Sequence, residues 1–581
     1  MRTGTSNGKF SVHAIAGTHV IILAFDATIQ AAKGLQGFAI FRIKYDKSGK
    51  DISNGGDWLK GYKPFKEVVP KPQTSVTYPT NLHPIQSFTW SDYAVETDRI
   101  YTYKVVPVFG TPDKPKYGDE LLLEKIKPEP IKDKLHEIHF NRGAAASQAY
   151  AMKFGNQKPN DKSLTEKEQK ERYTWLSHGL FEAVIEFIEK AKGEGWGLRA
   201  ALYELDQQDV LKAFKEAVDK NVDVKIVYEA RKGKNKNTQK LQDLTQTRDN
   251  KAALKKADFK LDDKEITFAR KNTSGIPHNK FIVLLKNGKP QMVWTGSTNI
   301  SEGGIFGHSN VGHCIKDEIL AGEYLKYWNF VSKDPDKDNL KSDVDKEWPL
   351  ISLDEIPQDK MTVIFSPRTG NKMLNTYADV LGSAQKLGII TLPFNVDERF
   401  ANILETGSEA IRYIMLNSGT DQSAAAEKFN PDPDVIVAPG SKFDDQWGQW
   451  LNEIHSGLNG SNVLYIHTKY LIVDPMGPKT LIITGSANFS TNSTSSNDEN
   501  MVIIPCINDE GKTRVQDIYL GEFFRLFDHW YFRYLHSIDT SSKTEQAKRR
   551  FLKSTSKEWV DPYFHEGSDR FKRRTYFSFG L

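Results

Sequence analysis

The sequence contains only two cysteines among 581 residues, and no apolar run approaches the length of a membrane span. Cys314 and Cys506 both stand in apolar surroundings. We therefore expect buried strand residues with free thiols, as in a reducing compartment, rather than a disulfide. The N-terminus, MRTGTSNGKF, lacks the apolar core of a signal peptide. These absences predict a cytoplasmic protein without a transmembrane segment.

An excess of one charge is also missing. The chain has 79 Lys and Arg against 75 Asp and Glu, and this formal net charge of +4 does not by itself indicate nucleic-acid or membrane binding. The apolar fraction of 38% and the charged fraction of 27% are those of an ordinary globular protein. The length exceeds what one hydrophobic core supports and predicts about two to four domains.

Residues 1–130 consist of short strand-like runs separated by Gly, Pro, Asn and Asp, without a helical period. The runs are Val20–Phe25, Gly37–Ile43, Ser87–Trp90 and Tyr101–Val108. They predict an all-β sandwich. Asp98, Tyr101 and Tyr103 together resemble the tyrosine-corner region of fibronectin type III domains. We expect this domain to dock a protein or to present a substrate.

From residue 131 onward the pattern changes to alternating strands and helices, and it occurs twice. Strand-like runs at Leu198–Tyr203 and Val222–Tyr228 in the first copy correspond to Gly388–Leu392 and Ile411–Leu416 in the second. Strand, helix and strand in this order predict parallel βαβ units. We therefore expect an α/β fold with halves at 131–350 and 351–540, packed as an intramolecular pseudo-dimer. A basic, aromatic extension follows at 541–581.

The most informative feature is a polar motif that occurs once in each half. It consists of a His, a Lys two residues later, and a Gly-Ser-x-Asn sequence that begins eighteen residues after the His. The motif residues are His278, Lys280, Gly296, Ser297 and Asn299, and then His467, Lys469, Gly485, Ser486 and Asn488. Alone, such a His is usually a packed residue, and Gly-Ser-x-Asn is a plain turn. Repetition in register instead predicts one two-fold active site.

These residue types suit attack on a phosphodiester, whose negative charge resists anionic nucleophiles. A neutral imidazole can attack the phosphorus while a protonated imidazole supplies a proton to the leaving oxygen. His278 and His467 would take these two roles. Lys280 and Lys469 would neutralise the phosphoryl oxygens, and hydrogen bonds would come from Ser297, Asn299, Ser486 and Asn488. With two ammonium groups in place, the reaction needs no metal or other cofactor.

The duplicated motif resembles that of the phospholipase D superfamily, over about residues 135–535. The resemblance implies two α/β halves that share one cleft, and a phosphodiesterase that forms a phosphohistidine intermediate. It also implies that Asp474 supports the second motif, whereas Leu285 stands at the corresponding place in the first. Glu499 falls where family members place a carboxylate that orients the second His. We therefore expect Glu499 beside His467.

A carboxylate beside only one imidazole would separate the roles of the two. Glu499 would raise the pKa of His467, which would then be the acid. The corresponding stretch of the first copy, Gly307–Asn310, has no carboxylate. His278 would therefore more easily be neutral and would be the nucleophile. His308 and His313 are expected at the rim of the site or as structural residues.

The substrate stays open at this stage, because family members act on phospholipids, on nucleic-acid backbones and on phosphotyrosyl–DNA bonds. The missing leader and two basic segments favour a nuclease. The segments are 231–236 with Lys240, and the tail with 548–551 and 570–574, although each is otherwise a solvated or packed surface. The alternative is a phospholipid hydrolase or transphosphatidylase, with an apolar surface at Trp447–Trp450. A third possibility is a binding protein with a decayed site, against which both intact His-Lys pairs count.

Overall fold

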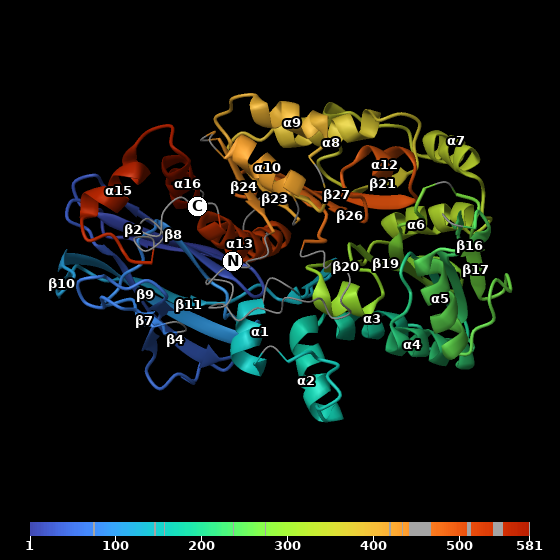
Figure 1. Ribbon diagram of the computed structural model, residues 1–581, viewed down its shortest axis with the longest axis horizontal. Helices are drawn as coiled ribbons and strands as arrows, with labels where there is room; N and C mark the ends of the chain where they lie inside the picture. The colour runs from blue at the N-terminus through green and yellow to red at the C-terminus, as the bar shows by residue number, and fades with distance from the viewer. Residues whose placement is uncertain are drawn as a thin grey trace.

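The structure is a computed structural model that contains a β-sandwich and two α/β halves (Figure 1). The residues it describes are 1–73, 76–143, 147–155, 157–235, 238–273, 275–394, 396–417, 420–430, 432, 434–440, 466–507, 513–537 and 550–579. In Figure 1 the sandwich lies on the left, and the two halves lie one above the other on the right.

The N-terminal sandwich has two antiparallel sheets, as the alternating runs predicted. Their orders are β1-β2-β3-β8 and β10-β9-β4-β5, with β11 paired to β9. Phe25, Phe38 and Tyr103 lie in the core between the sheets. The Tyr101 hydroxyl accepts a 2.8 Å hydrogen bond from the backbone N–H of Glu96, which is the contact of a tyrosine corner. The strands are β1 Arg2–Ser6, β2 Phe10–Ala16, β3 Ile21–Ala27, β4 Gly37–Asp46, β5 Asp57–Trp58, β8 Thr89–Asp92, β9 Arg99–Thr111, β10 Lys114–Tyr117 and β11 Leu121–Ile126, with a small ladder of β6 Lys60–Gly61 and β7 Tyr78–Pro79.

The two halves have the same sheet topology, which confirms the predicted duplication. The strand orders are β12-β20-β19-β18-β13-β14-β17 and β21-β27-β26-β25-β22-β23-β24, with parallel pairing only among the last three strands of each. The first sheet contains β12 His136–Phe140, β13 Trp196–Leu202, β14 Asp223–Glu229, β17 Thr267–Arg270, β18 Lys280–Lys286, β19 Lys289–Gly296 and β20 Val311–Ile315. The second contains β21 Thr362–Ser366, β22 Leu387–Leu392, β23 Ile411–Leu416, β24 Val435–Pro439, β25 Tyr470–Val473, β26 Lys479–Gly485 and β27 Glu499–Ile507.

Helices cover both faces of each sheet. The outer faces pack on α3 Leu180–Glu189, α4 Gln208–Asp219, α5 Thr245–Lys256, α8 Lys372–Gly382, α9 Glu398–Glu405 and α10 Thr420–Phe429. The inner faces share one core with α6 Glu318–Val331, α7 Lys337–Glu347 and α13 Arg514–Ser537. The other helical segments are α1 Ser147–Phe154, α2 Glu166–Ser177, η2 Gly303–Gly307, η3 Leu353–Glu355 and α12 Thr491–Ser495.

The motif strands are buried on both faces because they lie between these helical layers. Along β18, Phe281 and Val283 face the shared core, and Ile282 and Leu284 face the outer helices. Polar groups at the ends of such strands are therefore held rigidly. Cys314 and Cys506 are buried, free strand residues, as predicted. Among the residues that the structure describes, we find no helix with the length and apolar character needed to cross a bilayer.

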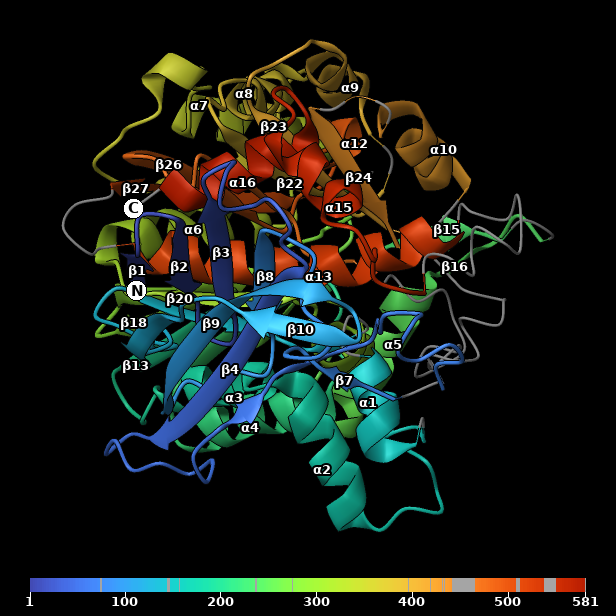
Figure 2. The same ribbon diagram turned by 90° about the vertical axis from the view of Figure 1, so that its left-hand side faces the viewer.

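The sandwich is fixed to the second half through α13, which crosses the molecule beside it (Figure 2). The Arg2 guanidinium, on β1, donates to the buried Asp517 carboxylate at 2.7 and 2.9 Å. The Tyr93 hydroxyl donates to Asp528 at 2.6 Å. The sheet face that carries Ile15 contributes to the shared core. One face of the sandwich is therefore already occupied within the chain.

The described part of the C-terminal extension forms α15 Ser556–Phe564 and α16 Asp569–Phe579, and these helices pack on the sandwich (Figure 1). Three of its basic residues form ion pairs inside the molecule, Lys572 with Asp434, Arg573 with Asp528 at 3.6 Å, and Arg574 with Asp26, and the Arg570 guanidinium lies over the Tyr563 ring. Of the two interpretations of the tail, the structure thus favours a packed end over a polyanion surface at 570–574. Residues 548 and 549 lie outside the described residues.

Trp559 provides a test of this packing. Its side chain is buried, its ring lies 5.7 Å from that of Phe88, and its indole N–H donates to the Leu35 carbonyl at 2.9 Å. We expect Trp559→Ala to lower the free energy of unfolding by about 3–5 kcal/mol, because it leaves a cavity and an unpaired carbonyl. Urea unfolding monitored by fluorescence measures this. Lys557→Ala, at an exposed position on the same helix, should change little. A loss below about 1 kcal/mol for Trp559→Ala would contradict the docking of α15.

Candidate active site

The two motifs meet at the interface between the halves. Each catalytic His candidate lies just before a motif strand, and each pairs its backbone with the other half. The His278 N–H donates to the Asp498 carbonyl at 2.9 Å, and the His467 N–H donates to the Ser309 carbonyl at 3.2 Å. The reciprocal contacts indicate a local two-fold relation. The centroids of the two imidazole rings lie 6.4 Å apart, so that one phosphoryl group can contact both.

Each imidazole is also held by a side chain from the opposite half. Nδ1 of His278 lies 2.9 and 3.1 Å from the Glu499 carboxylate oxygens. Nδ1 of His467 lies 2.9 Å from Oδ1 of Asn310. The Glu499 carboxylate accepts a hydrogen bond from its imidazole. Asn310 also accepts one through Oδ1, because its amide nitrogen already donates to the Gly304 carbonyl at 2.7 Å. Nδ1 of each ring therefore carries the proton, and Nε2 is left for the substrate.

The expected pairing of Glu499 with His467 is wrong. Glu499 binds His278, and the partner of His467 is Asn310, which the sequence reasoning did not select. The cause lies in the topology: β27 carries Glu499 at its first residue, and that end of the strand faces the other half rather than β25 of its own sheet. A signal for Asn310 was present, because it follows Ser297 by thirteen residues as Glu499 follows Ser486.

The two motif serines hold these partners in place. The Ser297 hydroxyl donates to Oδ1 of Asn310 and the Ser486 hydroxyl donates to Glu499, both at 2.7 Å. Their predicted role as donors to the phosphate is therefore corrected, since each hydroxyl proton is already used. The Oδ1 atoms of Asn299 and Asn488, by contrast, are buried without a partner within the described part of the chain. An amide oxygen only accepts a hydrogen bond, so a phosphoryl oxygen bound at either residue would use the amide nitrogen.

The lysines bring two like charges into a buried site. Lys280 is 1% exposed and Lys469 is 0% exposed, and each Nζ donates to the carbonyl of its own motif His, at 2.6 and 2.5 Å. Burial lowers the pKa of Lys280 to about 7, although Glu499 and Glu204 oppose the shift. Burial and the neighbouring Lys280 lower the pKa of Lys469 well below its usual range. A bound anion would reverse both shifts.

The imidazoles respond to burial in the same direction. Burial lowers the pKa of His278 to about 4, and the Glu499 carboxylate only partly offsets this. Burial and Lys469 lower the pKa of His467 well below its usual range. His308 lies beside the site, 5.6 Å from the His467 ring, as predicted. His313 lies in the core, as a structural residue, with its Nε2 2.9 Å from Nδ1 of His136.

Asp474 lies outside the site and supports the second motif from the far end of β25. Its carboxylate accepts the backbone N–H groups of Gln385, Lys386 and Leu387 at 2.8–2.9 Å, which fixes the start of β22. In the first half the corresponding Leu285 is buried in the shared core beside Gly197. Apolar packing thus takes the place of the polar anchor in the first half.

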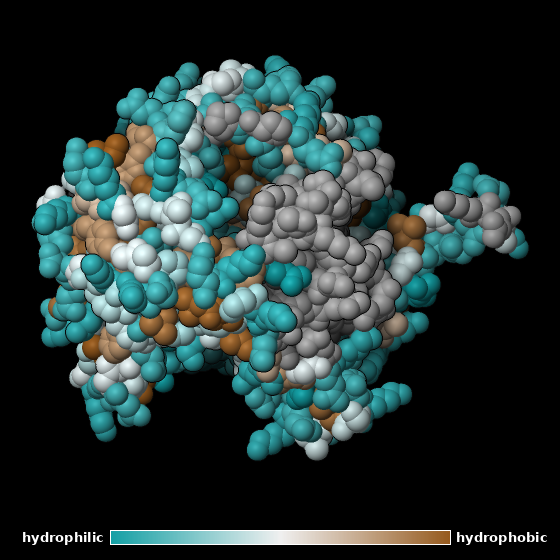
Figure 3. Space-filling view, turned by 60° about the vertical axis from the view of Figure 1, so that its left-hand side comes forward, coloured by the Kyte–Doolittle hydropathy of each residue, from teal (hydrophilic) through white to brown (hydrophobic). Residues whose placement is uncertain are grey.

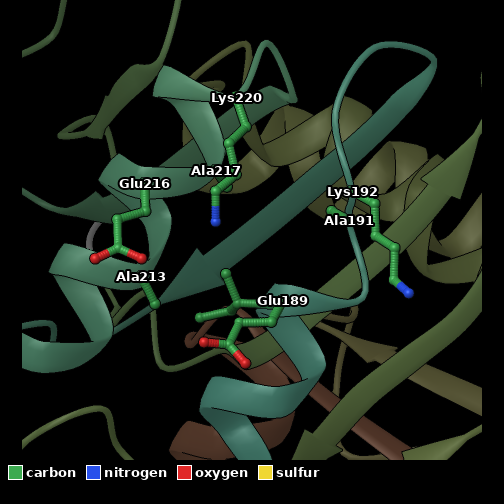
Figure 4. Close-up of a pocket in the computed structure, with 8 residues that line it drawn as sticks. Glu189, Ala191, Lys192, Ala213, Glu216, Ala217 and Lys220 are labelled. Atoms are coloured by element: carbon green, nitrogen blue, oxygen red, sulfur yellow. The ribbon is translucent and has the colours of Figure 1, made fainter.

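A cavity elsewhere in the first half is unrelated to this chemistry. It has a volume of about 210 Å³ and lies between α3 and α4, ringed by charged side chains (Figure 4). Its lining residues are Ile188, Glu189, Ala191, Lys192, Ala213, Glu216, Ala217 and Lys220, none of which belongs to a motif. Trp447 and Trp450, expected as an apolar surface, lie outside the described residues.

Comparison with known proteins agrees with the motif assignment. Residues 184–330 and 420–513 match a family model described as "Cardiolipin synthase, PLD-like domain", and each segment contains one complete motif. No curated protein matches the chain.

Several solved structures match parts of the chain with TM-scores below 0.5. Phosphatidylserine synthase from Haemophilus influenzae is 14% identical over 70% of this chain and 94% of its own, with a TM-score of 0.43. Yeast tyrosyl-DNA phosphodiesterase is 12% identical over 55% and 84%, with a TM-score of 0.30. The phospholipase D family member Nuc from Salmonella typhimurium is 22% identical over 26% and 87%, with a TM-score of 0.20.

The buried lysines predict that anion binding is coupled to proton uptake. Lys280, with its pKa of about 7, is charged at pH 6 and largely neutral at pH 9. A bound sulfate favours the charged form, so its affinity should fall above pH 7, by up to about tenfold per pH unit for one coupled proton. Calorimetry in buffers of different ionisation enthalpy measures both the affinity and the uptake. Lys280→Met should reduce the uptake. An affinity that does not change between pH 6 and 9 would contradict the assignment.

Proposed function

We propose that this chain, whose two α/β halves belong to the phospholipase D superfamily, is a phosphodiesterase that uses His278 and His467 as its reacting pair. The observation that carries the proposal is the 6.4 Å separation of the two rings, each with a fixed Nδ1–H, beside Lys280 and Lys469. Two bases and two cations around one small space suit the transfer of a phosphoryl group between oxygen atoms.

In the first step, Nε2 of His278 attacks the phosphorus, and the bond from phosphorus to the leaving oxygen breaks. His467 gives the proton on its Nε2 to that oxygen. His467 takes up this proton from the solvent when the anionic substrate binds, because a negative charge beside His467 raises the pKa of the imidazole. Phosphorylation makes the His278 ring positive, and the Glu499 carboxylate stabilises that charge. His278 thus keeps the role of nucleophile, for a reason opposite to the one expected from the sequence.

In the second step, water attacks the phosphorus of phosphohistidine and the P–N bond breaks. His467, now neutral, takes the proton of the water, and His278 returns to its neutral form with its proton still on Nδ1. An alcohol in place of water would give transfer instead of hydrolysis. Lys280, Lys469 and the amides of Asn299 and Asn488 would bind the phosphoryl oxygens in both steps.

Substitution of each His in turn tests which imidazole is the nucleophile and which is the acid. We expect His278→Ala and His467→Ala each to lower turnover by about 10³-fold or more, because neither step proceeds without both groups. With a labelled aryl phosphodiester, whose leaving group needs no proton, His467→Asn should accumulate an acid-labile phosphohistidine at His278. His278→Asn should form none. Rapid quenching and peptide mapping measure this. A label on His467 would reverse the roles, and inversion at a chiral phosphorus without an adduct would exclude the covalent step.

Metal independence is a separate prediction of the same arrangement. The charge of the phosphate is balanced by Lys280 and Lys469, so activity should persist in excess EDTA. The experiment incubates the protein with EDTA and, separately, plasmid DNA, RNA and a choline phospholipid, and scores the products. Loss of all activity in EDTA that Mg²⁺ or Zn²⁺ restores would refute this mechanism. The same panel identifies the substrate class.

For the substrate we favour nucleic acid, on the basis of a hairpin in the first half. The strands β15 Lys232–Lys234 and β16 Leu241–Asp243 project from the body after β14 (Figure 2). Figure 3 shows a mainly hydrophilic projection at the right. Lys232, Lys234 and Lys240 are exposed and form no ion pair with any described residue. At the hairpin's base, Arg231 donates to the Gly275 carbonyl at 2.6 Å, three residues before His278. Three exposed cations on a hairpin whose base contacts the segment before His278 suit a polyanionic strand.

Salt dependence tests the hairpin. The triple variant Lys232→Gln, Lys234→Gln and Lys240→Gln should bind single-stranded nucleic acid more weakly. The slope of log K against log salt should fall in magnitude by about 2, at ~0.7 per lost contact. Turnover of a small aryl phosphodiester should not change. The matched control replaces three exposed sandwich lysines, Lys33, Lys47 and Lys50, by Gln. Equal salt slopes for both triple variants would exclude the hairpin as a nucleic-acid contact.

A second candidate is the hydrolysis or transfer of a phospholipid head group. It is favoured by the family model that matches both halves, whose description names cardiolipin synthase. The same two-step chemistry applies, with a lipid alcohol in place of water. Product from the choline phospholipid, with none from DNA or RNA, would select this candidate. Protein docking through the sandwich stays a prediction, and it would have to use faces not covered by α13 and α16.

A further inference from the structure

The two sides of the candidate site are not equally supported, although their motifs are. Asn279 separates His278 from Lys280, and Thr468 separates His467 from Lys469. Asn500 directly follows Glu499, and Val311 directly follows Asn310. The duplication therefore supplies two equivalent pairs of positions: Asn279 with Asn500, and Thr468 with Val311.

Only the first pair forms a hydrogen bond. The Asn500 amide nitrogen donates to Oδ1 of Asn279 at 2.9 Å, across the interface between the halves. Oδ1 of Asn500 accepts from the Thr295 hydroxyl at 2.7 Å and from the Tyr324 hydroxyl at 3.1 Å. The Thr468 hydroxyl is buried without a partner within the described residues. Val311 offers no polar side chain. The network exists on the His278 side alone.

The network is buried and fixed at each of its atoms. Asn500 is 0% exposed and Asn279 is 2% exposed. Donors from the opposite half occupy the amide oxygen of Asn500, so its nitrogen is left to reach Asn279. A broken bond here would leave buried polar groups unpaired, which resists displacement of either segment.

We infer that Asn500 and Asn279 are positioning residues that hold Nε2 of His278 in line for attack. The inference rests on the proposed function. Asn500 fixes β27 next to Glu499, and Asn279 fixes the backbone next to His278. The bond between them therefore sets the place of the carboxylate relative to the imidazole. A nucleophile needs closer alignment than a proton donor, because the attacking atom must form a bond to phosphorus. The network thus lies on the side of His278, the proposed nucleophile, and not on the side of His467, the proposed acid.

The chain supplies its own substitutions for the test. Asn500→Val and Asn279→Thr transplant the residues of the other half. In each variant kcat for an aryl phosphodiester should fall, by up to about 100-fold, because a misplacement of ~1 Å can cost that much. KM and sulfate affinity should change less than about threefold, since the lysines are untouched. The double variant should lose no more than Asn500→Val alone, because Asn500→Val already removes the bond to Asn279. Thr468→Val, at the equivalent position beside His467, should leave kcat unchanged.

A spectroscopic signal tests the geometry without turnover. The proton shared by Nδ1 of His278 and Glu499 should give a low-field proton resonance, assigned by its loss in His278→Asn. In Asn500→Val this resonance should shift or broaden, and in Thr468→Val it should not. A folded Asn500→Val protein with an unchanged resonance and unchanged kcat, or additive losses in the double variant, would overturn the inference. An inactive wild-type protein with the expected change of the resonance would instead count against the proposed function alone.

Discussion

Each imidazole of the site is held by the half of the chain that does not carry it. Glu499 reaches His278 from β27, and Asn310 reaches His467 from β20. Neither half can therefore present a correctly oriented His by itself, since an imidazole without a fixed Nδ1 has two tautomers and a free ring torsion. The shared core, the matched sheets and the crossing backbone contacts all maintain this exchange. The interface between the two halves therefore orients the imidazoles of the candidate site in addition to joining the domains.

The contact between the halves also brings the buried side chains of Lys280 and Lys469 close to each other. Two lysine side chains lie in a site with almost no solvent contact, and Glu499 and Glu204 offset only part of the effect of burial on their pKa values. Such an arrangement is unfavourable when empty and favourable when an anion is bound. The empty site thus favours the neutral amines, and binding of a phosphoryl group favours their charged forms. The serines, which could have served the substrate, hold the partners of the histidines instead.

Much of this could be predicted from the sequence. Strand periodicity and the repeated offsets located both halves, and residue type located the lysines and histidines, because burial of such groups between strands demands a function. What could not be predicted was which half would hold which imidazole. Spacing along the chain places Glu499 near the second motif, yet hydrogen bonding depends on which sheet end faces the interface. Asn500 could not be identified from the sequence for the same reason, since its partners, Asn279 and Thr295, lie more than 200 residues away along the chain.

The contact between Arg574 and Asp26 joins residues that are 548 positions apart. The sandwich leaves the ribosome before the two halves, whereas α15 and α16, which cover part of its core, leave after them. During synthesis, the apolar surface that receives Trp559 therefore stays open to water while both halves are made. A nascent chain that stops before α15 keeps that surface exposed. Closure of this part of the sandwich core is thus delayed until both halves have been made.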